Sequence, residues 1–563
     1  MYSESNNFIL IREMKNYLLI VSLFLGIKSF SQYADIKWSA PSTEKKDHIG
    51  YSKVISGDGK YLYTSTIANE SGYTIHNAVG ASAYLKFRDN TIVAYDRETM
   101  TKTATITIDG DNKSISGSPE FKNFLLLKAF VSEEKVVLFI DKNIDISTKR
   151  IAVVELTPEL KPIGNPRVVH EIKVPRDKFS AEDPDIIKNQ NTGAYVIVVE
   201  SQGKQENILM SYKTLSPDFS IGDVGEMDLP LAWDAGLNKK AREYLFLGED
   251  HLVLNANVKE EVPNAPWKKR WLFYSIFTVV TLSKGEGGTY MLKSDEMKYS
   301  GINMEIKNGM ASILGFYSNT DDEGDNPVIN GFFSSTLDIK AGEFKNTVTS
   351  EFDYDFYSNF KNYYPEKTKS KKKVIPNHYV NEIRIEKRIR KGNKTILVCC
   401  VQNNEVIRYS NGNELPHCVN RGVISFVLNE TFQVEKFSVI PRVSRYDFIH
   451  KVDDMEVAPL DGDSYIIVYS SNADLKEVNK EGKPDMKEEE VYENELYYAV
   501  MNEAGDLTEG KIALNNVSSN TKDKKFDLLP NEFRESGGKL YVFGTLNSGK
   551  KDVQILIGEM IAK

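Results

Sequence analysis

The sequence predicts an all-β protein built from repeated four-stranded units, and three observations support this prediction. A short pattern, in which a polar turn with Gly, Asp or Asn passes directly into an apolar strand, occurs eight times. A second pair of strands around a polar turn follows most occurrences, as in TIVAYDRETMTKTATITI from Thr91. The composition agrees, because 29 Tyr and 27 Phe favour strands over helices.

The repeated units predict a ring. The eight turn-and-strand segments begin at Ser56, Ser132, Gln190, Gly248, Lys307, Lys391, Asp461 and Ser536. A four-stranded sheet cannot bury both of its faces alone, so each unit must stack between two neighbours. We therefore expect a single β-propeller of eight blades. Seven blades, or a pair of smaller propellers, are the alternatives.

The two ends of the chain are expected to meet. The last unit ends after DVQILIGEMIAK and is one strand short, while YADIKWSAP from Tyr33 precedes the first unit without a partner. If this N-terminal strand completes the last blade, the ring has no open edge. The prediction is that Tyr33 to Ser39 lies beside Asp552 to Met560.

Two segments resemble known propeller families. VISGDGKYLYTS, from Val54 to Ser65, resembles the strand-entry turn of TolB-like and YVTN-type propellers, which implies a fold and no function. AEDPDIIKNQNTGAYVIVVES, from Ala181 to Ser201, resembles the blade-opening strand of five-bladed glycoside hydrolases. That resemblance implies that Asp183 is a general base. Such hydrolysis needs a second carboxylate, and no partner Glu stands in a comparable context. An Asp-Pro turn that enters a strand explains the same residues.

The N-terminal segment has the layout of a secretory signal. From Met14 the chain reads MKNYLLIVSLFLGIKSFSQ, with a Lys, an apolar run too short for a membrane anchor, and small residues before Gln32. We expect translation to start at Met14, residues 1–31 to be an extension and signal peptide, and residues 32–563 to be the exported propeller. The FSQ ending resembles signals of Bacteroidota. A buried N-terminal helix is the alternative.

Composition and motifs exclude several kinds of site. The net charge of −9 argues against nucleic-acid binding. No Ser/His/Asp arrangement or zinc pattern is visible, so we expect no catalytic residue, cofactor or metal ligand, although calcium binding stays open. Because neighbours on a strand point to opposite faces, only one of Cys399 and Cys400 could meet Cys418 in a disulfide. Small buried core residues are the preferred interpretation for these cysteines.

One insertion, residues 353–377, is the best candidate for a binding site. It fits neither strand nor helix patterns and lies between the fifth and sixth units. We expect its aromatic and basic residues to contact a partner, namely Tyr354, Phe356, Tyr357, Phe360, Tyr363, Tyr364, Lys371, Lys372 and Lys373. The next strand adds Arg384, Lys387, Arg388, Arg390 and Lys391. If the aromatic residues are exposed they mark a binding surface, and if they fold back they cap the disc.

A second insertion has the opposite charge. Residues 471–495 interrupt the seventh unit and end in Glu488, Glu489, Glu490, Glu493 and Glu495. Charge runs are usually solvated loops, and exposed ion pairs add little stability. Attraction between the two insertions would therefore not explain the aromatic residues of the first.

Together these features predict a non-enzymatic periplasmic scaffold that docks on an outer-membrane or secretion-associated protein complex. The alternative is a carbohydrate-active or lectin-like propeller, with Asp183 as a general base. A secreted, adhesive protein is a third possibility. We expect that deletion of Tyr354 to Lys373 leaves the fold intact and abolishes the native complex.

Overall fold

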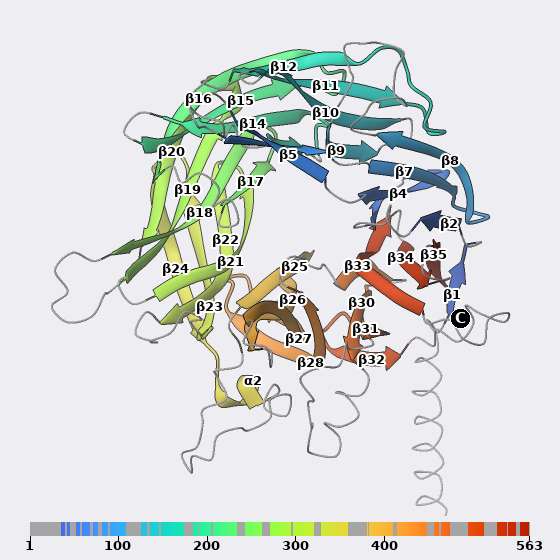
Figure 1. Cartoon of the computed structure of the whole chain (residues 1–563). Helices are drawn as coiled ribbons and strands as arrows, with labels where there is room; N and C mark the ends of the chain where they lie inside the picture. The colour runs from blue at the N-terminus through green and yellow to red at the C-terminus, as the bar shows by residue number, and fades with distance from the viewer. Residues whose placement is uncertain are drawn as a thin grey trace, which may run out of the picture.

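The fold is known from a computed structural model, which describes the chain in segments. They are residues 35–39, 42–45, 52–56, 59–67, 71–76, 82–87, 90–108, 125–131, 135–145, 148–173, 184–189, 191–203, 206–232, 242–261, 271–293, 297–319, 328–358, 380, 382–408, 414–447, 455–460, 463–472, 494–511, 526–536, 539–547 and 552–561. The described strands form nine sheets, of which eight are arranged in a ring as blades and the ninth is a two-stranded hairpin (Figure 1). The prediction of one eight-bladed propeller is confirmed.

Each of the first four blades consists of four antiparallel strands. Blade 1 contains β3 (Ser52–Ser56), β4 (Tyr61–Ile67), β7 (Asn90–Asp96) and β8 (Thr101–Ile108), with an inserted hairpin of β5 (Ser71–His76) and β6 (Ser82–Phe87). Blade 2 contains β9 (Leu125–Val131), β10 (Val136–Asp145), β11 (Thr148–Leu156) and β12 (Arg167–Lys173). Blade 3 contains β13 (Asp185–Lys188), β14 (Tyr195–Gln202), β15 (Asn207–Leu215) and β16 (Ile221–Ala232). Blade 4 contains β17 (Arg242–Leu247), β18 (His251–Glu261), β19 (Trp271–Thr281) and β20 (Glu286–Lys293), with a 3-10 turn at Leu282–Lys284.

The other four blades follow the same plan. Blade 5 contains β21 (Met297–Lys307), β22 (Met310–Asn319), β23 (Gly331–Asp338) and β24 (Glu343–Glu351), and the short helix α2 (Tyr354–Ser358) follows it. Blade 6 contains β25 (Glu382–Lys391), β26 (Lys394–Arg408), β27 (Glu414–Leu428) and β28 (Val434–Asp447). Blade 7 contains β29 (Met455–Pro459), β30 (Tyr465–Asn472), β31 (Asn494–Met501) and β32 (Leu507–Lys511). Blade 8 contains β33 (Phe526–Ser536), β34 (Lys539–Asn547), β35 (Asp552–Ile561) and β1 (Asp35–Trp38).

The N-terminal strand closes the ring, as predicted. β1 is the outermost strand of blade 8 and pairs antiparallel with β35 from Asp35↔Ile561 to Trp38↔Gly558. The short strand β2 (Ser42–Lys45) also pairs with β35, further along that strand, and places Lys45 opposite Asp552. Ser39 lies between the two and donates its backbone N–H to the Ile557 carbonyl at 2.7 Å. Gly558 allows this approach, because a Cβ there would lie 3.0 Å from the Trp38 ring.

The core is divided among the contacts between blades. Buried apolar residues form eight clusters, and each cluster joins two consecutive blades of the ring. Neighbouring residues on a strand therefore belong to different clusters, because successive side chains point to opposite faces. Leu252 packs between blades 3 and 4, whereas Val253 packs between blades 4 and 5. The pattern explains why the second strands are continuous apolar runs.

Seven turns between third and fourth strands share a residue in the left-handed conformation. The residues are Met100, Leu160, Phe219, Gly285, Gly342, Phe432 and Gly505, with φ from 57 to 80°. Each lies against the preceding blade: Phe219, for example, stacks on Tyr195 with ring centroids 5.5 Å apart and packs in the cluster shared by blades 2 and 3. Where the residue is glycine, the preceding blade is close. A Cβ on Gly505 would lie 2.5 Å from Val427 Cγ2.

We predict that Gly505→Ala destabilises the protein far more than Gly392→Ala. Both glycines have positive φ, so both substitutions carry backbone strain of about 1 kcal/mol. A Cβ on Gly392 meets nothing within 4 Å, whereas the one on Gly505 overlaps Val427. Overpacking of this kind adds about 1–3 kcal/mol. Urea denaturation of the two variants measures the difference in the free energy of unfolding. Equal losses in the two variants would contradict the close contact between Gly505 of blade 7 and Val427 of blade 6.

Blade 2 holds a histidine that burial keeps neutral. His170 lies on β12 opposite Ile151, and its Nδ1 atom is buried with no hydrogen-bond partner among the described residues. Burial, with a further contribution from Lys213, lowers the pKa of His170 from 6.5 to about 4. The unfolded chain therefore binds a proton between these pH values that the folded chain does not bind.

We predict that stability falls as the pH is lowered from 6.5 towards 4, and that His170→Gln removes part of this dependence. The lowered pKa has no effect on stability while His170 is neutral in both states, and below pH 6.5 protonation of the unfolded histidine favours the unfolded chain, so the loss begins near pH 6.5. The slope of the free energy of unfolding against pH reports how many more protons the unfolded chain binds. In the variant this number should be smaller by up to one proton between pH 6.5 and 4. An unchanged slope would show that His170 is not the group responsible.

Candidate partner-binding face

The antiparallel order of the strands sorts the connections onto two faces of the ring. First–second and third–fourth connections turn at one face, here called the turn face, and all other connections leave from the opposite one, the loop face. On the turn face the longest connection is 157–166. On the loop face the connections include 68–89, 109–124, 352–381, 473–493 and 512–525. The loop face is therefore where long segments of variable sequence can gather.

Both predicted insertions leave from the loop face on either side of blade 6. Residues 352–381 join blade 5 to blade 6, and residues 473–493 join β30 to β31 within blade 7. Blade 6 itself is long on this face: β25 begins with Glu382 opposite Gln402, but β26 continues to Arg408 and pairs with Glu414 of β27. The loop face of blades 5 to 7 is our candidate partner-binding face.

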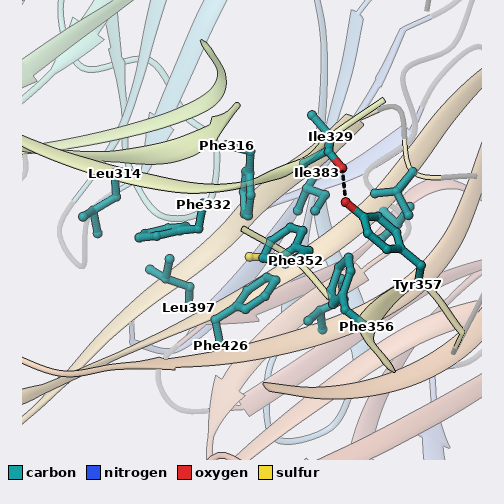
Figure 2. Packing of buried hydrophobic residues seen from close by; sticks show 14 of the residues in the cluster. Leu314, Phe316, Ile329, Phe332, Phe352, Phe356, Tyr357, Ile383, Leu397 and Phe426 are labelled. Carbon is teal, nitrogen blue, oxygen red and sulfur yellow. Dashed lines mark hydrogen bonds between the residues drawn. The ribbon is translucent and has the colours of Figure 1, made fainter. Parts of the chain in front are cut away.

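The start of the first insertion is fixed in the core. Phe352, Phe356 and Tyr357 are buried in the cluster between blades 5 and 6 (Figure 2). The Phe352 ring stacks on Phe426 of β27 with centroids 5.5 Å apart, and Phe356 meets Phe437 of β28 edge-on at 5.3 Å. These contacts fill the wedge between the two blades.

Hydrogen bonds hold both ends of the insertion at one place. Phe352 donates its backbone N–H to the Asn330 carbonyl at 2.8 Å, and Ile329 donates to the Val380 carbonyl at 2.7 Å. The Tyr357 hydroxyl also donates to the Ile329 carbonyl at 2.8 Å (Figure 2). Asp353 begins α2 by accepting the Phe356 N–H at 2.9 Å. The segment thus leaves and re-enters the propeller beside one short stretch before β23.

These contacts correct part of the sequence interpretation. Tyr354 is 60% exposed, as a partner-contacting residue should be, but Phe356 and Tyr357 fold back into the core and anchor the segment. Residues 354–358 also form a short helix, which the sequence did not predict. A deletion that begins at Tyr354 would remove core residues, so the expectation that it leaves the fold intact is wrong for this boundary.

The remaining expected contact residues are not placed. Phe360, Tyr363, Tyr364, Lys371, Lys372 and Lys373 lie outside the described residues, as do Asp183, the glutamates at 488–490 and 493, and residues 1–31. Glu495 is described through its backbone, which pairs with Ser471. The roles expected for these residues stay predictions.

Strand β25 carries the basic residues predicted to follow the insertion, and it lies near the ring axis. The first strands of neighbouring blades contact one another around the axis (Figure 1). Arg384 pairs with Glu386, Arg390 with Glu305 at 2.8 Å, and Lys391 with Asp463 at 3.5 Å. The positive charge of β25 therefore lies on the inner wall of blade 6 and is paired there with acidic side chains.

A polar network inside the contact between blades 6 and 7 was not predicted. Arg442 is buried, donates to Cys400 Sγ at 2.9 Å and to the Ser470 carbonyl at 3.3 Å, and lies over the Tyr469 ring. Arg421 is buried at a register shift between β27 and β28. Pro441 inside a strand is the sequence signal that could have indicated this irregularity.

The cysteines occupy the core. Cys399 and Cys400 are buried thiols, one in the cluster between blades 5 and 6 and the other in the cluster between blades 6 and 7. The preferred interpretation is confirmed for both. Burial raises the pKa of the Cys399 thiol well above its usual value, so this thiol is protonated and unreactive. Cys418 pairs through its backbone with Asn404.

A membrane-spanning helix and a metal-binding cluster are both absent from the described residues. No helix in the described part of the chain has the length and hydropathy to cross a bilayer. Among the same residues, His, Cys, Asp and Glu side chains nowhere gather in groups of three or more that could hold a metal ion.

Comparisons with known proteins identify no family for this chain. No protein-family model matches the chain, and no curated protein does. Solved structures match at low identity. The match to a lignostilbene dioxygenase of Pseudomonas brassicacearum covers 84% of this chain and 90% of that protein's chain, with 9% identity and a TM-score of 0.35. The polysaccharide lyase Uly1 covers 77% of this chain and 89% of its own, with 11% identity and a TM-score of 0.33. The WD40 domain of SCAP from fission yeast covers 92% of this chain and 98% of its own, with 10% identity and a TM-score of 0.31.

We predict that Phe356→Ala destabilises the propeller by about 3–5 kcal/mol, whereas Tyr354→Ala changes its stability by less than about 0.5 kcal/mol. Phe356 is buried among Phe352, Phe426 and Phe437, and Tyr354 on the same short helix is exposed. Denaturation in urea compares the two variants. Similar losses from both would mean that α2 is not anchored as described.

Proposed function

We propose that this chain is an exported, non-enzymatic β-propeller that binds a protein partner through the loop face of blades 5 to 7. The observation that carries the proposal is that the insertion between blades 5 and 6 begins with side chains buried in the core. Three buried aromatic residues fix its base, and Tyr354 is exposed beside them. Aromatic residues on a fixed base lose little entropy on binding and are typical anchors of protein interfaces.

The neighbouring features support the same surface. The strands of blade 6 continue past the start of β25, and the acidic insertion of blade 7 leaves from the same face. The first insertion carries lysines and the second carries glutamates, and opposite charges on segments that leave from one face favour a partner that presents both signs, because complementary charges set orientation and association rate. The signal-like N-terminus suggests that this partner is a complex at the periplasmic side of the outer membrane or one associated with secretion.

We predict that replacing residues 360–378 with a Gly/Ser linker leaves the melting temperature unchanged and abolishes recovery of the native complex. The replacement keeps α2 and Val380, so the buried base is preserved. Affinity purification from native membranes, with mass spectrometry of the recovered proteins, provides the measurement. Tyr354→Ala should weaken recovery without affecting the fold.

The matched control replaces residues 109–124, which also leave from the loop face but join blades 1 and 2. This variant should recover the complex as the unmodified chain does. Equal recovery after the 360–378 replacement would contradict the proposal. Turnover of a glycan that is lost on Asp183→Ala would favour the carbohydrate-active alternative instead.

A further inference from the structure

Strand β25 is unusually basic for its position in the fold. It carries five cationic and two acidic residues in the sequence EIRIEKRIRK, in a protein of net charge −9. It is the first strand of blade 6 and contacts the first strands of blades 5 and 7 near the ring axis. A concentration of cations on an inner strand is expensive to bury and calls for local counter-charges.

Three of the five cations have assigned partners. Arg384 pairs with Glu386 on the same strand. Lys387 donates to the Val457 carbonyl of blade 7 at 3.0 Å, and Lys391 pairs with Asp463. The contacts of Lys387 and Lys391 connect blade 6 to blade 7, and that of Arg384 lies within β25.

The other two cations share one carboxylate. Arg390 Nη2 lies 2.8 Å from Glu305 Oε2 of β21, and Arg388 Nη1 lies 3.5 Å from the same oxygen. Two guanidinium groups and one carboxylate leave a local excess of one positive charge. Glu305 and Arg390 are near the ends of their strands, so the group lies towards the turn face, opposite the candidate partner-binding face.

Arg388 lacks hydrogen-bond partners for part of its guanidinium group. Its side chain is 8% exposed, and Nη2 donates to Ser312 Oγ at 3.2 Å. Nε and Nη1 are buried and have no hydrogen-bond acceptor in the described part of the chain. The guanidinium lies over the Phe432 ring at 5.6 Å, and burial lowers its pKa below the usual value. Buried donors without acceptors are costly, so an acceptor is expected here.

We propose that Arg388 and Arg390 form a binding site for an oxyanion, a carboxylate or sulfate group, and that Glu305 occupies this site in the free protein. A carboxylate or a sulfate can accept two parallel hydrogen bonds from one guanidinium group, which a single Glu305 oxygen 3.5 Å from Nη1 does not do for Arg388. Glu305 is 40% exposed and can rotate towards solvent when a ligand replaces it. This site is independent of the proposed partner-binding face.

The test uses Glu305→Gln, which removes the internal competitor and keeps the side-chain size. Isothermal titration of the full chain with sulfate, and separately with succinate, is carried out at constant ionic strength. We expect Glu305→Gln to bind at least one of the two anions about tenfold more tightly than the unmodified chain, because a negative charge next to the site is gone. Arg390→Gln in the Glu305→Gln background should remove the gain. Whichever anion responds identifies the ligand group.

Glu171→Gln is the matched control. Glu171 pairs with Arg150 at 3.0 Å, with exposures of 39% and 43% against 40% and 47% for Glu305 and Arg390. The control should titrate as the unmodified chain does, and a thermal melt of each variant verifies its fold. Identical titrations for Glu305→Gln and Glu171→Gln would overturn the proposal and assign the unbonded donors of Arg388 to water.

Discussion

The structure depends on one constraint, which is that every blade has two apolar faces and each must be covered by another blade. Eight clusters satisfy this requirement around the ring, and the last of them needs β1 beside β35, since Ile36 and Met560 pack against blade 7 from the two strands. An open ring would expose the apolar faces of blades 1 and 8, including Leu62 and Tyr541. The N-terminal strand therefore contributes directly to the contact between blades 7 and 8 and covers the edge of β35.

Because each blade has an even number of strands, the turns that pack against the preceding blade lie on the turn face and the longest connections lie on the loop face. On the turn face, short turns place Met100, Leu160, Phe219 or Phe432 against the preceding blade in a conformation that non-glycine residues adopt only at a cost of about 1–2 kcal/mol. Packing offsets this cost, so those turns cannot vary freely. On the loop face the requirement is local: Phe352, Phe356 and Tyr357 fix the base of the insertion after blade 5, and the connections of this face differ greatly in length. Changes that spare such buried residues leave the contacts that hold the ring intact.

The sequence predicted the fold because each second strand is an apolar run that begins after a short polar turn, and because the last unit lacks one strand. It could not show that Phe356 and Tyr357 turn inwards while Tyr354 faces solvent. A helix of five residues is too short for an apolar period to emerge, so the direction of each side chain is set by the wedge between blades 5 and 6. Arg421 and Arg442 were missed for a similar reason, since register shifts and not alternation bring them inside.

Blade 6 departs most from the plan that the sequence predicts. Arg388 is buried at its contact with blade 5 and Arg442 at its contact with blade 7, each stacked on an aromatic ring. Apolar residues of similar volume would often stabilise such contacts at least as well as buried charges. Local violations of the folding rules are expected where a protein has another task. Arg388 lies towards the turn face, whereas the long ends of the blade 6 strands and the roots of both insertions lie at the loop face, so blade 6 departs from the plan at both of its ends.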